Sequence, residues 1–432
     1  MSVTATAQRR ITRLATLTAV HRAFHWLHIH QPQLRQWQLE LVRIPAPPFG
    51  ESNRAAWFLE RFHQLGLTSI HLDDAGNALA ELAPDPARTL LKSVIPTEGG
   101  VERPAFNPSE SEQPAVAPVV LLSAHLDTVF PIETPINPIE EKDSCRILAP
   151  GICDNAAGLT GLLAIAAALR YANIAPPIPI LFAANVGEEG EGDLRGMRHL
   201  FERGPYRNRI AAAIALEGSG NSAVVTRALG SLRFRVTITG PGGHSWTDAG
   251  TPNPILLLSL ALTHIAALKL PSDPATTVNV GQISGGTAIN SIPESATALL
   301  DIRSTEPTQL IATATHVHQI LDDVTATQKT TKLRIETIGN RPAATLPADS
   351  PLLHTLRAVD RHLTLRTEPR LGSTDANIPL SRNIPAIAIG AGGTGGGIHT
   401  LQEWYDTTHR ETALRRILLT LLDTAENLIP DT

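Results

Sequence analysis

Short apolar runs alternate with longer helical stretches over most of the chain. The runs at 119–123, 178–186, 211–216 and 386–389 are almost continuously apolar, which is typical of strands that are buried on both faces of a parallel sheet. Helical segments lie between them, such as the Ala- and Leu-rich segment 158–169. This alternation predicts an α/β domain with a mixed, mainly parallel sheet.

A second pattern occupies residues 226–340. The expected order is strand, helix, two strands, helix and strand, at 232–239, 254–268, 277–283, 296–302, 307–325 and 332–338. This β-α-β-β-α-β order is that of a ferredoxin-like α+β domain. We therefore expect domain 226–340 to be inserted into a larger domain made of residues 1–225 and 341–432. Residues 1–33 form an N-terminal helical extension, and the Pro-, Glu- and Ser-rich segment 92–118 a flexible insertion.

Composition and charge exclude several classes of protein. The 432 residues are 42% hydrophobic and carry a formal net charge of -5, which argues against wholesale disorder and against binding to nucleic acid or an anionic membrane. No apolar run is long enough to span a bilayer, and the N-terminus is a poor signal peptide. Two cysteines, Cys145 and Cys153, favour reduced thiols and a cytoplasmic location.

Acidic and imidazole side chains follow the expected strands or open the next helix. They are His125, Asp154, Glu188, Glu189, Glu217 and His399. Each has an ordinary explanation alone: Asp154 can cap a helix, and Glu188 and Glu189 can lie on a solvated turn. Because the carboxyl ends of parallel strands form one edge of a sheet, we expect the six to meet there. Such a ligand set suits two divalent ions about 3.5–4 Å apart.

Two local spacings support a metal site. Asp127 follows His125 by two residues, so its carboxylate is expected to accept the ring N–H and orient the imidazole. Glu188 and Glu189 lie between Gly187 and Gly190, where one carboxylate can bind a metal while the other takes a proton from water. Imidazole ligands favour Zn²⁺, with Co²⁺ or Mn²⁺ as alternatives.

Several motifs extend this pattern along the chain. HLDTV, GICDNAAG, GEEG, LEGSG, GPGGHSW, AINSIPE, DIRS and GGIHT occur in this order. In these motifs the chain resembles the M20 metallopeptidase family, the dinuclear-zinc group of tripeptide aminopeptidases, glutamate carboxypeptidases and acylamino-acid deacylases. The resemblance runs from about residue 35 to the end and includes the inserted domain.

The resemblance implies a role for each matching residue. Asp154 would bridge two zinc ions, with His125 and Glu217 on one ion and Glu189 and His399 on the other. Asp127 would orient His125, and Glu188 would be the general base. In the inserted domain, His244 would reach the substrate carbonyl across a homodimer, and Asn290 and Arg303 would bind substrate oxygens or a carboxylate. These assignments refer to the positions in the motifs quoted above.

The expected activity is metal-dependent hydrolysis of an amide bond in a small peptide or an N-acyl amino acid. The contexts GPGGHSW and DNAAGLT look most like the tripeptide aminopeptidase branch, while an N-acyl amino acid deacylase remains an alternative within the same chemistry. A non-catalytic relative that binds a peptide or an amino-acid conjugate is the second class, and a structural dimerisation scaffold the third. A homodimer is expected, with the inserted domain as its contact.

Overall fold

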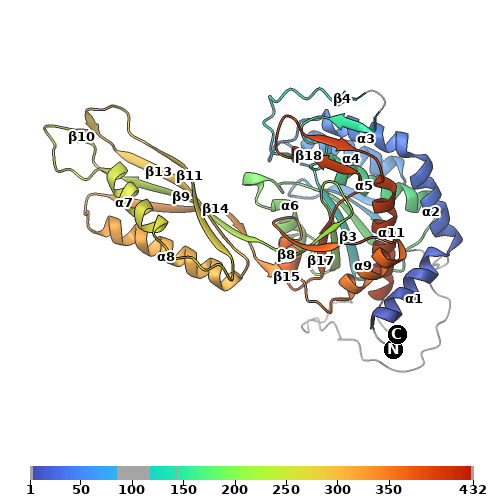
Figure 1. Cartoon of the computed structure of the whole chain (residues 1–432). Helices are drawn as coiled ribbons and strands as arrows, with labels where there is room; N and C mark the ends of the chain where they lie inside the picture. Colours follow the sequence, from blue (N-terminus) through green and yellow to red (C-terminus); the bar gives the residue numbers. More distant parts are fainter. Residues whose placement is uncertain (1–2, 85–116, 142–143, 430–432) are drawn as a thin grey trace. The chain divides into compact units, whose positions relative to one another are not determined.

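The structure is a computed structural model that describes residues 3–84, 117–141 and 144–429 (Figure 1). Most of the expected insertion 92–118 lies outside these residues. The chain folds into two compact units. Unit 1 comprises 1–224, 347–369 and 384–432, and unit 2 comprises 225–346 and 370–383.

The centre of unit 1 is a mixed sheet. The strands of this sheet that lie wholly in unit 1 run in the order β1 (Thr68–Leu72), β2 (Ala78–Leu82), β6 (Ile180–Asn185), β3 (Val119–His125), β7 (Ile210–Leu216) and β17 (Ala386–Ile389). β6, β3, β7 and β17 are parallel, while β1 and β2 are antiparallel to their neighbours. Every residue of β3, β6 and β17 is buried. The mixed, mainly parallel sheet is confirmed.

Helices cover this sheet. α5 (Ala156–Tyr171) is apolar on all sides and buried from Ala156 to Leu169, as expected of a helix enclosed by other elements. It packs on β3, β6 and β7, and it also contacts α2 (Thr18–Ile29), α3 (Gln31–Val42) and α11 (Arg410–Asn427). α4 (Ser52–Gln64) packs on β1 and β2. Because α5 begins beside the carboxyl edge of the sheet, the loop before it lies at that edge.

The expected N-terminal extension forms α1 (Val3–Ala15), α2 and the start of α3. α1 packs on α9 (Pro351–His362) and α11, and Arg10 pairs with the buried carboxylate of Asp423 at 2.9 Å. The extension is therefore an integral layer of unit 1. None of the helices in the described ranges has the length and apolarity that a bilayer span requires.

A small sheet accompanies the main one. It contains β4 (Ile139–Glu140), β5 (Arg146–Leu148), β19 (Trp404–Asp406) and β18 (Thr394–Gly396). The loop between β18 and β19 carries His399, and β5 leads to the loop that carries Asp154. Because β5 and β19 pair, these two loops are adjacent.

Unit 2 has the expected β-α-β-β-α-β order. β11 (Thr276–Gly285), β13 (Ser295–Ser304), β9 (Gly230–Thr239) and β14 (Lys332–Arg341) form an antiparallel sheet in that spatial order. α7 (Pro254–Ala266) and α8 (Pro307–Ala326) pack on it. The core contains alternate residues of β9, namely Phe234, Val236 and Ile238.

The boundary of the inserted domain differs from the expectation. Unit 2 continues to Leu346, beyond residue 340, and includes residues 370–383, which the sequence pattern places in the larger domain. Asn377 in α10 (Asn377–Ser381) donates from Nδ2 to the backbone oxygens of Leu229 and Pro342. These long-range hydrogen bonds attach the later segment to unit 2, and no local sequence pattern encodes them.

Candidate metal centre

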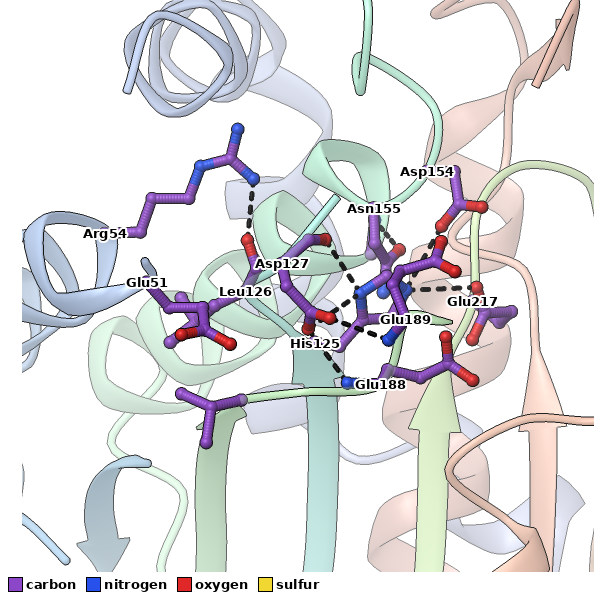
Figure 2. Close-up of polar contacts among 12 residues, drawn as sticks. Glu51, Arg54, His125, Leu126, Asp127, Asp154, Asn155, Glu188, Glu189 and Glu217 are labelled. Atoms are coloured by element: carbon purple, nitrogen blue, oxygen red, sulfur yellow. Dashed lines mark hydrogen bonds and ion pairs between the residues drawn. The ribbon is translucent and has the colours of Figure 1, made fainter. Parts of the chain in front are cut away.

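The residues expected at the strand ends do meet, within unit 1 (Figure 2). His125 is the last residue of β3, Glu188 and Glu189 follow β6, and Glu217 follows β7. The set is completed by Asp154, before α5, and by His399, between β18 and β19. Three overlapping groups have ligand atoms within 4.8 Å of one another: His125–Glu188–Glu189, His125–Asp154–Glu217 and Asp154–Glu189–His399.

Asp154 joins two of these groups. Its Oδ1 lies 3.1 Å from Nε2 of His125, and its Oδ2 lies 3.2 Å from Nε2 of His399. Nε2 of His125 is also 3.4 Å from Oε1 of Glu217, and Nε2 of His399 is 3.0 Å from Oε1 of Glu189. One carboxylate therefore lies between two imidazoles, each of which has a second carboxylate beside it.

Asp127 fastens the ends of two strands. It is fully buried, and its Oδ1 and Oδ2 accept the backbone N–H groups of Glu188 at 3.0 Å and Glu189 at 2.7 Å. Nδ1 of His125 lies 3.0 Å from the backbone oxygen of Asp127 and 3.6 Å from its Oδ1. Donation from Nδ1 leaves Nε2 free of hydrogen for a ligand role. The sequence predicted that the Asp127 carboxylate would accept this N–H. In the structure the nearest acceptor is instead the backbone carbonyl of Asp127.

His399 has an unusual backbone. Its φ is 64°, in the left-handed region that costs free energy for residues other than glycine. Its side chain is half-exposed, whereas the ring of His125 is fully buried. Residues held in this region are frequent at functional sites.

Two residues that sequence reasoning missed hold the Asp154 loop. Glu403 accepts the backbone N–H groups of Gly151, Cys153 and Asp154 at 2.7–2.8 Å. Asn155 donates from Nδ2 to the Leu216 oxygen, and its Oδ1 accepts from the N–H groups of Gly158 and Gly218. Asn155 therefore ties the Asp154 loop to the loop that carries Glu217. The sequence contained no spacing signal for either residue.

Glycine is required where α5 begins. A Cβ atom on Gly158 would lie 2.2 Å from Oδ1 of Asn155 and 2.7 Å from the Leu216 oxygen. No side chain fits there, because one of the opposing atoms belongs to the backbone. The close approach lets Asn155 connect the two loops.

A buried arginine supports the other side of the site. Arg54 on α4 is fully buried and donates from Nη1 to the Leu126 oxygen at 2.7 Å (Figure 2). Its Nε donates to the Ile44 oxygen. Burial lowers the pKa of Arg54 to about 10, while Asp127 and Glu403 act against that change. The guanidinium is therefore charged at neutral pH and fixes the backbone between His125 and Asp127.

The crowded carboxylates change one another's proton affinity. Burial raises the pKa of Glu217 to about 8, with Asp154 and Glu188 adding to the rise. Burial and Glu188 raise the pKa of Glu189 to about 7. Burial alone would raise the pKa of Asp154, but hydrogen bonds with His125 and His399 lower it strongly. Negative charge in this cluster thus exceeds what the imidazoles neutralise.

The imidazoles respond in the opposite sense. Burial would lower the pKa of His125, but Glu217, Asp127 and Asp154 raise it well above its usual value. A hydrogen bond with Asp154 is the main reason why the pKa of His399 rises to about 9. The cluster therefore retains protons at neutral pH, and a divalent cation can take their place.

The donor set fits two divalent ions. Oε2 of Glu217 is shielded from solvent and has no hydrogen-bond partner in the described part of the chain, as expected of an atom reserved for a ligand. The donors are imidazole nitrogens and carboxylate oxygens, which suit Zn²⁺, Co²⁺ or Mn²⁺. Cys153 does not join them: it is buried, and burial raises the pKa of its thiol to about 12.

His244 and Asn290 are neighbours in unit 2. β10 (Gly243–His244) pairs with β12 (Ser291–Ile292), and Ser245 donates to the Asn290 oxygen at 3.0 Å. Nδ1 of His244 accepts the backbone N–H groups of Trp246 and Thr247. In the neutral ring the hydrogen is then on Nε2, which makes Nε2 a donor. Both residues are exposed.

Arg303 is not part of that group. It pairs with Ser231 near the start of β9, whereas Ser295, eight residues earlier on β13, pairs with Thr239 at the end of β9. Eight residues of strand span roughly 26 Å, so Arg303 lies at the opposite end of the sheet from the β10–β12 pair. Its Nε donates to Asp301 Oδ2 at 2.7 Å. Arg303 thus takes part in an ion pair within β13, and its expected role in substrate binding stays a prediction.

The chain matches the model of peptidase family M20/M25/M40 over residues 121–427. The chain belongs to this family. The matched region contains every residue of the metal cluster as well as Glu403. The resemblance deduced from the motifs is therefore confirmed.

A curated relative is similar to part of the chain. A probable carboxypeptidase from Aspergillus terreus is 28% identical over 259 residues, which make up 56% of this chain and 58% of that protein. The chain thus covers little more than half the length of this relative.

The structural neighbours cover nearly the whole chain. A tripeptidase from Staphylococcus aureus has a TM-score of 0.70 and 21% identity, over 91% of this chain and 98% of that chain. A dinuclear metal-binding peptidase of the M20 family from Bacillus subtilis has a TM-score of 0.62 and 14% identity, over 91% and 98%. At these identities the likeness establishes the fold.

Proposed function

We propose that this chain is a metal-dependent hydrolase that cleaves an amide bond in a small peptide or an N-acyl amino acid, with two divalent metal ions bound per chain. One observation carries the proposal: the two carboxylate oxygens of Asp154 face the separate imidazoles of His125 and His399, at 3.1 and 3.2 Å. A bridging carboxylate between two ligand groups is the arrangement that a two-metal hydrolase needs.

The ligands divide between the two ions. His125 and Glu217 would bind one ion, Glu189 and His399 the other, and Asp154 both, as the ligand groups indicate. Zn²⁺ suits these donors best. Bound ions of this kind lower the pKa of a water molecule and polarise a carbonyl group.

Glu188 is proposed as the general base. Its carboxylate belongs to the group formed with His125 and Glu189, and its backbone is fixed by Asp127. It would take a proton from the attacking water and deliver that proton to the leaving nitrogen. Asp127 holds the backbone of Glu188 and of Glu189 through adjacent N–H groups, which supports both side chains from one point.

His244 is proposed to stabilise the oxyanion. With Nδ1 occupied by two backbone N–H groups, its Nε2 would donate to the carbonyl oxygen of a substrate bound in the partner subunit. A donor that strengthens its hydrogen bond as negative charge develops accelerates the reaction. Asn290, whose backbone lies beside Ser245, is proposed to bind another substrate oxygen.

The substrate is a peptide or an N-acyl amino acid. A peptide is favoured because the matching family is a peptidase family and because structural neighbours are named as peptidases. Deacylation of an N-acyl amino acid uses the same chemistry and remains the second candidate. A non-catalytic binding role would leave the complete ligand set and Glu188 without a purpose.

We also propose a homodimer formed through unit 2. β11 is an edge strand of its sheet, and Ile283 on this strand is 54% exposed. α7 packs on β11 and exposes Leu256 and Leu260. An edge strand beside exposed apolar side chains favours pairing with a second copy.

A cytoplasmic location is proposed as well. The two cysteines, Cys145 and Cys153, are free thiols, as is usual for proteins of a reducing compartment.

The test combines metal content with hydrolysis. The purified protein is stripped with a chelator and titrated with Zn²⁺, Co²⁺ or Mn²⁺, and binding is followed directly. Turnover is then measured on di- and tripeptides, peptides with a blocked N-terminus or C-terminus, and N-acetyl amino acids. We expect two ions per chain and metal-dependent release of an amino acid. Metal binding without cleavage of any substrate would favour the non-catalytic alternative.

A further inference from the structure

Glu403 is a fully buried carboxylate with an unusual set of partners. Its Oε1 accepts the backbone N–H groups of Cys153 and Asp154, both at 2.8 Å, and its Oε2 accepts that of Gly151 at 2.7 Å. A buried carboxylate is costly unless its oxygens are hydrogen-bonded. Here three backbone donors of one loop satisfy it, so the side chain and the loop depend on each other.

The backbone of Glu403 belongs to the loop that carries His399. Its N–H donates to the Thr400 oxygen at 3.2 Å, which closes the turn after His399. Its own carbonyl oxygen accepts the N–H of Ala149 at 3.0 Å. Glu403 therefore connects the His399 turn to the Asp154 loop through both its backbone and its side chain.

This connection acts on the centre of the ligand set. Asp154 is common to two of the ligand groups, and His399 belongs to one of them. A shift of the Gly151–Asp154 backbone would move one oxygen of Asp154 away from His125 and the other away from His399. Ligands need to be held within a fraction of an ångström for metal binding, and residues behind the ligands provide that precision.

We propose that Glu403 is a positioning residue for the two-metal site: it holds the Asp154 loop against the His399 turn so that one carboxylate serves both ions. This inference rests on the proposed function, because it assumes that the ligand groups bind metal. The carboxylate form of Glu403 is required, since all three partners are N–H donors.

The direct test is Glu403→Gln. The amide keeps one acceptor oxygen but places an NH₂ group against at least one backbone N–H, so two donors face each other. Binding of Co²⁺ to the metal-free protein is measured by competition with a chelating dye, and the visible absorption of bound Co²⁺ reports ligand geometry. We expect Co²⁺ affinity about 10–100-fold weaker and an altered spectrum. Excess Co²⁺ should restore occupancy of both sites.

Asp360→Asn is the matched control. Asp360 is also a buried carboxylate of unit 1, but it pairs with Arg416. The control should lower the melting temperature and leave Co²⁺ affinity and the spectrum unchanged. If Glu403→Gln does not fold, Glu403→Asp is the second variant, because it keeps the charge but shortens the side chain by one methylene. It should weaken Co²⁺ binding and alter the spectrum in the same direction, but less.

The outcomes separate the two proposals. A wild-type protein that binds no metal would contradict the proposed function and this inference together. A wild-type protein that binds two ions, with variants of unchanged affinity and spectrum, would overturn the role of Glu403 alone. An equal loss of affinity in Asp360→Asn would also overturn it, because general destabilisation would then explain the result.

Discussion

Asp127 accepts the backbone N–H of Glu188 at 3.0 Å, so the end of β3 determines where the loop after β6 lies. Its other oxygen accepts the N–H of Glu189 at 2.7 Å. A proposed metal ligand and the proposed base are thus positioned by one buried carboxylate. Neither bond involves the side chain of the residue that it positions.

Replacing that carboxylate tests its importance. In Asp127→Asn, the amide NH₂ would face one of two N–H donors, and the negative charge beside His125 would be lost. We expect kcat/KM to fall about 10–100-fold, with a smaller loss of metal affinity. Asp406→Asn is the control, because Asp406 accepts a backbone N–H from Thr408 at an exposed site. Wild-type kcat/KM in Asp127→Asn would contradict the positioning role.

Glu188→Gln should separate catalysis from metal binding. The amide is nearly isosteric but cannot take a proton from water, so we expect kcat to fall about 10²–10⁴-fold while the metal content stays at the wild-type level. Glu191→Gln provides the control, since Glu191 is an exposed acid just beyond Gly190. Metal content is measured by elemental analysis beside turnover. Near-normal turnover of Glu188→Gln would assign the proton transfer to another group.

The stability of the metal-free protein should fall as pH rises. The pKa of Glu217 is raised from 4.5 to about 8 in the folded state, so its contribution is present below pH 4.5 and lost as pH rises through 8. The pKa of His399 is raised from 6.5 to about 9. Its contribution is present below pH 6.5 and lost as pH rises through 9.

The pKa of Asp154 is lowered, so the stability that its carboxylate contributes is lost only when the pH falls into the acidic range. We therefore expect the melting temperature in excess chelator to decrease between about pH 5 and pH 9. With Zn²⁺ present the decrease should shrink, because metal replaces the protons. Scanning calorimetry in both conditions measures this difference. A melting temperature of the metal-free protein that rises over the same range would show that the cluster does not retain these protons.

The proposed homodimer can be broken without touching the metal site. Leu260→Glu introduces a charge at an exposed leucine of α7, the helix that packs on the edge strand β11. We expect a dimer for the wild type and a monomer for the variant in sedimentation velocity, with wild-type metal content. Ile29→Glu on α2 alters another exposed apolar side chain and should remain dimeric. A monomeric wild type would remove the basis for this interface.

The local pattern of apolar and polar residues was sufficient to predict the main helices and strands and the types of the candidate ligand residues. The continuous apolar runs identify β3, β6, β7 and β17 because strands buried on both faces need no polar alternation. The order of elements in 226–340 likewise predicted unit 2. The candidate ligands could be identified because each follows a strand, and parallel strands end at a common edge. The motifs, read together, identified the family before any geometry was known.

Other features could be seen only in the tertiary structure, because they consist of hydrogen bonds between segments that are far apart in the sequence. Glu403 meets Gly151 and Asp154 across about 250 residues of sequence, and Asn377 attaches residues 370–383 to unit 2 in the same way. Hydrophobic periodicity records which side of an element is buried, whereas hydrogen bonds between loops depend on how the whole chain packs.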